Sequence, residues 1–195
     1  MPTLRLQAAD SGEANPMGMK VLYILRHGKS SSTPEGGTDH DRALTRRGKR
    51  AAAAVGTEFA RRGWVPARAL VSSARRTRLT FEHFSRGLAE AGGGTVEECV
   101  EPALYLAPPD RILDCLATLD DDLPSVLIIG HNPGLHELAC ALSAGEESTA
   151  AARLTGGFPT CALAVFHCTA DDWADIGPRT ANLEAVILAR DLHQS

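Results

Sequence analysis

Cysteine pairs, long apolar runs and an excess of one charge are all missing from this sequence of 195 residues. None of the five cysteines forms a C-x-x-C pair, and an odd number of thiols does not make a complete disulfide framework. We therefore expect reduced thiols in a cytoplasmic protein. The cysteines are Cys99, Cys115, Cys140, Cys161 and Cys168.

The missing apolar runs and the balanced charge exclude several kinds of partner. No apolar run reaches the roughly 18 residues that a membrane-spanning helix needs. The net charge of −4 gives no overall bias towards nucleic acid or an anionic membrane, so we expect neither as a partner. Residues 1–18 contain no apolar segment typical of a secretory signal. We expect them to form a flexible lead before a single domain over residues 19–195.

Short apolar runs alternate with helical patterns along the chain. Continuous apolar runs are typical of strands buried on both faces, and they cover residues 19–25, 67–73 and 125–130. Apolar residues at helical spacing predict helices that start near Thr45, Ser73, Pro109 and Pro133. Further patterns predict strands over residues 95–100, 160–168 and 173–176, the last two joined as a hairpin, and a C-terminal helix from about Asn182. This order predicts a three-layer α/β/α fold with a mainly parallel central sheet.

The segment "VLYILRHGKSSS", Val21 to Ser32, contains two patterns that could handle phosphate. A P-loop needs a glycine five residues before Gly28, but that position is Tyr23, inside the predicted strand. The Gly-Lys-Ser pattern is therefore an ordinary loop start. Arg26 and His27 directly follow the strand, at the edge of an open sheet where ligands bind.

The three buried strands bring basic side chains to this same edge. Arg26 and His27 follow the first strand, Arg76 lies one turn into the helix after the second, and His131 follows the third. Guanidinium groups can hold a phosphoryl group through paired hydrogen bonds. A neutral imidazole is a competent nucleophile, and nearby arginines lower its pKa.

The rest of this edge also favours an anion over a metal. Asn132 suits the N-cap of the helix that starts at Pro133, and the free amides there would add donors for an anion. Two histidines without a supporting carboxylate or thiolate cluster are poor zinc ligands. We therefore predict a phosphoryl-binding site that needs no metal and no other cofactor.

Four blocks of the sequence carry a family resemblance: "YILRHGKS", "DRALTRRGKR", "VSSARRTRLT" and "VLIIGHNPGL". In this order they resemble the histidine phosphatase superfamily, which has the phosphoglycerate mutase-like fold. The short length and the Gly-His-Asn-Pro form are most similar to the phosphohistidine phosphatase (SixA) branch. The resemblance implies that His27 is the nucleophile, which becomes phosphohistidine, and that Arg26, Arg76 and His131 hold the phosphoryl group.

One departure from the family bears on the substrate. Mutase-type members supply a carboxylate that protonates an oxygen leaving group, and this sequence offers only Glu101, Asp110 and Asp41 as candidates. A missing acid favours a substrate with a good leaving group, such as a protonated imidazole. Arg42 and His40 are further candidates for the mouth of the pocket.

The sequence thus predicts a phosphatase that works through a covalent phosphohistidine intermediate, with phosphohistidine on a protein as its substrate. Two alternatives stay open. One is a small-molecule phosphomonoesterase of the same superfamily, with an unidentified acid. The other is a module that binds phosphorylated ligands without turnover. The expected partner is accordingly a phosphorylated protein or a small phosphorylated substrate.

Overall fold

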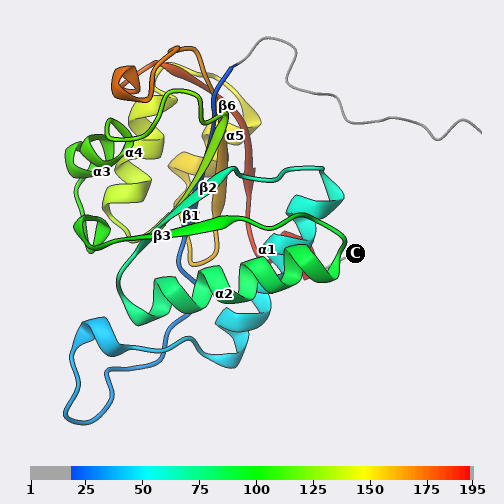
Figure 1. Ribbon diagram of the computed structural model, residues 1–195, viewed down its shortest axis with the longest axis vertical. Helices are drawn as coiled ribbons and strands as arrows, with labels where there is room; N and C mark the ends of the chain where they lie inside the picture. Colours follow the sequence, from blue (N-terminus) through cyan, green and yellow to red (C-terminus); the bar gives the residue numbers. More distant parts are fainter. Residues whose placement is uncertain (1–18, 194–195) are drawn as a thin grey trace, which may run out of the picture.

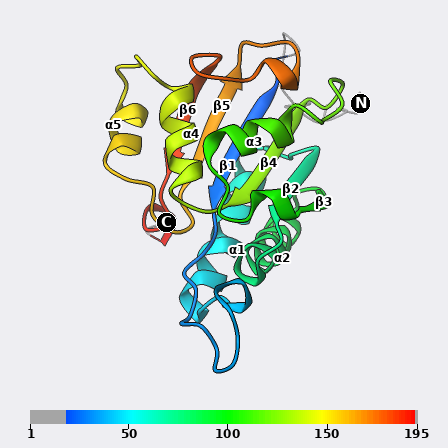
Figure 2. The same cartoon turned by 90° about the vertical axis from the view of Figure 1, so that its left-hand side faces the viewer.

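The computed structural model describes residues 19–193, and these residues form a mixed six-stranded sheet between two layers of helices (Figures 1 and 2). The strand order is β3-β2-β4-β1-β5-β6. Neighbours among β3, β2, β4 and β1 pair in parallel, whereas β5 runs antiparallel to both β1 and β6. The strands are β1 Val21–Arg26, β2 Arg68–Ser72, β3 Glu97–Glu101, β4 Ser125–Gly130, β5 Leu163–Cys168 and β6 Ala181–Ile187. The predicted three-layer α/β/α fold is confirmed, while the predicted lead over residues 1–18 lies outside the described residues.

The helices divide between the two faces of the sheet. In Figure 1, α3 and α4 lie to the left of the sheet and α1 and α2 lie at the lower right. The helices are α1 Arg46–Arg61, α2 Arg75–Glu90, α3 Pro109–Leu116, α4 Gly134–Leu142 and α5 Thr149–Thr155. Four 3₁₀ turns also occur in residues 19–193: η1 Asp39–Asp41, η2 Pro102–Leu104, η3 Trp173–Asp175 and η4 Asp191–His193. No helix in this part of the chain is both long and apolar enough to cross a membrane.

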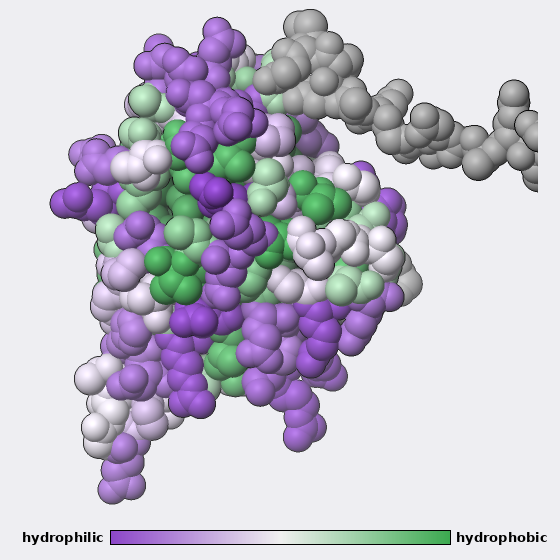
Figure 3. All heavy atoms as spheres, in the orientation of Figure 1, coloured by the Kyte–Doolittle hydropathy of each residue, from purple (hydrophilic) through white to green (hydrophobic). Residues whose placement is uncertain are grey.

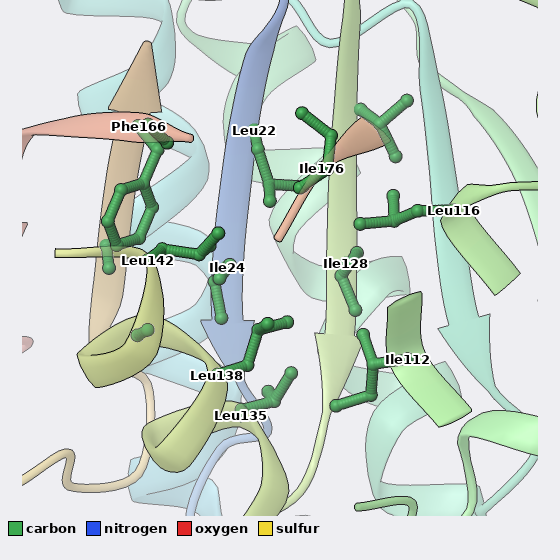
Figure 4. Packing of buried hydrophobic residues seen from close by; sticks show 14 of the residues in the cluster. Leu22, Ile24, Ile112, Leu116, Ile128, Leu135, Leu138, Leu142, Phe166 and Ile176 are labelled. Atoms are coloured by element: carbon green, nitrogen blue, oxygen red, sulfur yellow. The ribbon is translucent and has the colours of Figure 1, made fainter. Parts of the chain in front are cut away.

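The continuous apolar run of β1 is buried because helices cover both faces of the sheet. Successive side chains of a strand point to opposite faces. Leu22 and Ile24 therefore join the core under α3, α4 and α5, whereas Tyr23 and Leu25 join the core under α1 and α2. Figure 4 shows Ile24 close to Leu138 and Leu142 of α4.

Two glycines let α1 and α2 pack backbone to backbone. A Cβ atom added at Gly56 of α1 would lie 2.0 Å from the Phe84 carbonyl oxygen. A Cβ atom added at Gly87 of α2 would lie 2.1 Å from the Ala53 carbonyl oxygen. Any side chain at either position would push the two helices apart. This close packing fixes α2, whose first turn carries Arg76, against the rest of the fold.

Two of the predictions for the C-terminal third of the chain are wrong. Residues 173–176 were expected to form a strand, but Trp173 lies in the 3₁₀ turn η3, fully buried. Its backbone N–H donates to Asp121 Oδ1 (2.9 Å) and its indole N–H to the Leu123 carbonyl (3.1 Å). The expected helix from Asn182 is instead the strand β6, which pairs with β5. Tertiary pairing overrides the local helix propensity here.

The start of α4 also differs from the sequence prediction. The helix begins at Gly134, with Pro133 at the capping position. Asn132 does not cap it, because its side-chain Nδ2 donates to the Phe158 carbonyl oxygen (2.9 Å). By contrast, Thr45 caps α1 as expected, since its hydroxyl accepts from the Gly48 N–H (3.1 Å). The short helix α5 was not predicted.

We expect Gly56→Ala to destabilise the protein by about 3 kcal/mol, because overpacking a tight helix contact costs free energy. Urea unfolding followed by circular dichroism measures this change. The matched control is Gly177→Ala, since a Cβ atom at Gly177 would meet nothing within 4 Å. An equal effect of both substitutions would contradict the proposed packing constraint.

Candidate active site

The parallel register of β1 and β4 brings His27 and His131 together. Arg26 at the end of β1 pairs with Gly130 at the end of β4. The next residue of each strand is a histidine, and the His27 N–H donates to the Gly130 carbonyl oxygen (3.1 Å). The centroids of the two imidazole rings are 5.2 Å apart. Both residues are buried, with 8% of His27 and 3% of His131 exposed.

Backbone contacts orient the His27 ring. Its Nδ1 lies 2.8 Å from the Gly28 carbonyl oxygen, which can only accept a hydrogen bond. The ring proton therefore sits on Nδ1, and Nε2 carries a free lone pair. The Gly28 N–H donates in turn to the Thr80 hydroxyl (3.0 Å). That hydroxyl donates to the Arg76 carbonyl oxygen (2.6 Å), which links this loop to the first turns of α2.

Ser72 and Tyr105 hold the His131 ring. The Ser72 hydroxyl, at the end of β2, lies 2.8 Å from Nε2 of His131. The Tyr105 ring meets the imidazole edge to face at a centroid distance of 5.5 Å. Nδ1 of His131 is buried and has no hydrogen-bond partner among residues 19–193. The second imidazole is thus held by Ser72 of β2 and by Tyr105, which follows η2.

Two arginines, the half-buried Arg26 and the buried Arg76, line the same pocket as the two histidines. Arg76 is 2% exposed and donates to the Asp39 carbonyl oxygen (2.7 Å) and to Asp39 Oδ2 (2.9 Å). Arg26 donates through NH1 to the Phe158 carbonyl oxygen (2.8 Å). Its Nε is buried without a partner in the described part of the chain. Arg26 therefore keeps donor capacity for a bound oxyanion.

The loop after β1 supplies Asp39 and Arg42 to the site. It projects from the body at the lower left of Figure 1. Figure 3 shows no strongly hydrophobic residue at this projection. Within the loop, Asp41 caps the turn η1 by accepting from the Thr38 N–H (2.9 Å). This turn presents Asp39, which also accepts from Arg42 NH1 (2.9 Å) and from the Tyr105 hydroxyl (2.9 Å).

These side chains surround a pocket of about 440 Å³. Its lining residues are Arg26, His27, Lys29, Ser30, Asp39, Arg42, Arg76, Leu106, His131, Asn132 and Thr160. A larger hollow of about 940 Å³ lies between α1, α5 and β6. The charged groups along it pair with one another, as Glu58 does with Arg61 and Arg62, and Arg153 with Asp191. The smaller pocket is therefore the candidate active site.

Burial keeps both imidazoles neutral near pH 7. Burial lowers the pKa of His27 from 6.5 to about 4, and the charges of Arg76, Arg26 and Arg42 contribute to this shift. The hydrogen bond to the Gly28 carbonyl acts in the opposite direction but is weaker than burial. Burial likewise lowers the pKa of His131 to about 3, with contributions from His27 and Arg76. An unprotonated Nε2 on His27 is consequently available at physiological pH.

The structure brings Arg26, His27, Arg76 and His131 together at one pocket. Arg42 also lines this pocket. His40 does not line the pocket: its Nε2 lies 3.0 Å from the Ser73 hydroxyl, and its ring makes an edge contact with the Tyr105 ring.

None of the three carboxylates that the sequence offered as acids lines this pocket. Glu101 caps the Ala103 N–H, Asp41 caps η1, and Asp110 lies in the first turn of α3. The carboxylate that does line the pocket, Asp39, was missed from the sequence. The Thr-x-x-Asp capping box over residues 38–41 was the one signal for the turn that presents it.

Comparisons with known proteins identify the family. Residues 22–98 match the model of the histidine phosphatase superfamily, branch 1. An uncharacterised protein of Mycobacterium tuberculosis is 33% identical over 167 residues, which cover 82% of this chain and 96% of that protein. The chain therefore belongs to the histidine phosphatase superfamily, as its sequence blocks predicted.

Two solved structures refine this likeness. The proposed phosphohistidine phosphatase SixA of Nakamurella multipartitia is 29% identical, covers 89% of this chain and 98% of its own, and has a TM-score of 0.73. The proposed SixA of Agrobacterium tumefaciens is 27% identical, covers 87% of this chain and 97% of its own, and has a TM-score of 0.71. The chain is thus similar to SixA proteins over most of its length.

We expect His27 and His131 to titrate well below pH 6.5, which two-dimensional NMR of the imidazole nitrogens can measure. Because these pKa values are lower in the folded state, the unfolded chain binds more protons between about pH 6.5 and pH 4. The free energy of unfolding therefore falls as the pH is lowered through this window, by on the order of 3 kcal/mol for His27. His27→Asn should flatten this dependence, and two rings that titrate near pH 6.5 would contradict the prediction.

Proposed function

We propose that this protein hydrolyses a phosphoryl group through a covalent phosphohistidine at His27. The observation that carries the proposal is an imidazole fixed by its Nδ1–H with Nε2 free, beside Arg26 and Arg76 and 5.2 Å from the His131 ring. A fixed neutral imidazole is an activated nucleophile. Guanidinium groups placed around a phosphoryl group stabilise the charge on its oxygens in the transition state.

The reaction takes two displacement steps. In the first, Arg26, Arg76 and His131 hold the phosphoryl oxygens, and the lone pair of His27 Nε2 forms a bond to phosphorus. The bond from phosphorus to the leaving atom breaks, and that atom keeps the electron pair. In the second step, water attacks phosphorus from the side that the leaving group has vacated. The bond from phosphorus to Nε2 breaks, which restores the free imidazole and yields inorganic phosphate.

We further infer that the substrate is phosphohistidine on a protein. The carboxylates expected to serve as acids lie outside the pocket, so they cannot protonate an oxygen leaving group. A phosphorylated imidazole needs no such acid once its ring is protonated. The SixA proteins to which the chain is similar are named for this same substrate class. A small-molecule phosphomonoesterase and a non-catalytic binding module are the alternatives that the following experiments test.

We expect His27→Ala to abolish turnover and to prevent labelling of the protein by ³²P-phosphoramidate, with the fold intact. Gels run after an alkaline SDS quench measure the label, which should be alkali-stable and acid-labile because it is a phosphoramidate bond to histidine. Full activity or full labelling of the variant would exclude His27 as the nucleophile. Tight binding of a phosphorylated ligand by the wild type, with no label and no turnover, would favour the binding module.

A second pair of variants tests the guanidinium groups. Arg76→Ala should lower kcat by about 10²- to 10³-fold, because it removes a charged donor from the transition state. Arg75→Ala is the matched control, since Arg75 is the exposed residue before it and does not line the pocket. Similar losses in both variants would contradict the assignment of Arg76 to the phosphoryl group.

A further inference from the structure

Asp39 is the carboxylate at the mouth of the pocket, and three donors hold it. Arg76 NH2 and the Tyr105 hydroxyl both donate to its Oδ2, each at 2.9 Å, and Arg42 NH1 donates to its Oδ1 at 2.9 Å. The Asp39 side chain is still 45% exposed, whereas the Arg76 side chain is 3% exposed. Asp39 is therefore the more exposed partner of the buried Arg76 guanidinium.

These contacts keep Asp39 ionised. The hydrogen bonds from Arg42 and Tyr105 hold the pKa of this carboxyl well below its usual range, and Arg76 adds to the effect. An ionised carboxylate accepts hydrogen bonds and has no proton to donate. Asp39 therefore cannot serve as the acid that an alkyl phosphate ester requires.

The direction of attack places the leaving group near Asp39. Under the proposed function, His27 attacks phosphorus in line with the leaving atom, which must lie on the far side of phosphorus. His27 is 8% exposed, whereas Leu106 is 53% exposed and the Asp39 side chain 45% exposed, so we take the far side of phosphorus to face the solvent-exposed part of the lining. The Asp39 carboxylate belongs to this exposed part of the lining, together with Arg42 and Leu106.

This inference rests on the proposed function and deepens it. We propose that Asp39 is a specificity residue that selects substrates in which phosphorus is bonded to a protonated, N–H-bearing nitrogen group, and disfavours phosphate esters. Phosphohistidine with a protonated ring and phosphoramidate both belong to the favoured class. A negative carboxylate attracts the positive leaving group and repels the negative charge that develops on an ester oxygen.

The bond changes during attack agree with this role. The lone pair of His27 Nε2 forms the new N–P bond while the P–N bond of the substrate breaks and its electrons pass to the leaving nitrogen. A protonated phosphoimidazole leaves as neutral imidazole, which keeps the N–H on its other nitrogen. Asp39 accepts a hydrogen bond from that N–H throughout, so no proton needs to be transferred to or from the carboxylate.

The test compares two small substrates in three proteins. Wild type, Asp39→Asn and the control Asp110→Asn are assayed with phosphoramidate and with p-nitrophenyl phosphate, an ester whose leaving group needs no acid. Asp110 makes a matched control because it is an exposed carboxylate that does not line the pocket. We expect Asp39→Asn to lower kcat/KM for phosphoramidate at least about tenfold and to leave that for the ester unchanged or raised. Asp110→Asn should change neither value.

A purely structural role of Asp39 predicts a different outcome. If Asp39→Asn lowers kcat/KM for both substrates by the same factor, Asp39 does not select the leaving group and the inference is overturned. Asp39→Glu keeps the charge and should retain a preference for phosphoramidate, even if the loop is disturbed. Failure of the proposed function gives a third, distinguishable result. The wild type would then hydrolyse neither substrate and would form no phosphoenzyme.

Discussion

The parallel pairing of β1 with β4 is the constraint on which the rest of the site depends. It sets Arg26 opposite Gly130, so the chain leaves both strands at the same level and each strand is followed by a histidine. A shift of one residue in this register would turn the strand's side chains to the opposite faces of the sheet and separate the two rings. The burial of β1 and β4 on both faces specifies their register. The hydrophobic core thereby determines that the two histidines lie next to each other.

A second constraint comes from the charge balance around the buried rings. Arg26, Arg42 and Arg76 line the same pocket as His27 and His131, so a charged imidazole there would face both desolvation and repulsion. The rings stay neutral, and the hydrogen bond to the Gly28 carbonyl determines which nitrogen of His27 is free. The proposed nucleophile therefore lies in a pocket lined by three arginines, and among residues 19–193 Asp39 is the single negative group that lines this pocket.

The sequence predicted the central strands of the sheet, because continuous apolar runs between turn residues admit few other structures. It also predicted that His27 and His131 lie at the same edge of this sheet. It failed at β6, where Ala181 and Leu183 alternate with exposed neighbours, but alanine, leucine and glutamate also favour helices. It also failed at Asp39, since an isolated aspartate in a polar loop looks like any surface charge. Only the folded loop brings its carboxylate within 2.9 Å of Arg76 and Tyr105.

The central claim is that Arg26, His27, Arg76 and His131 surround one tetrahedral anion. A crystal structure of the protein with tungstate or orthovanadate tests this claim most directly, with calorimetric titration of the same ion in solution. The account predicts a single bound oxyanion that contacts both arginines and both imidazoles, with the metal atom of the ion in line with His27 Nε2. An anion bound at another place, or no binding at this pocket, would contradict it.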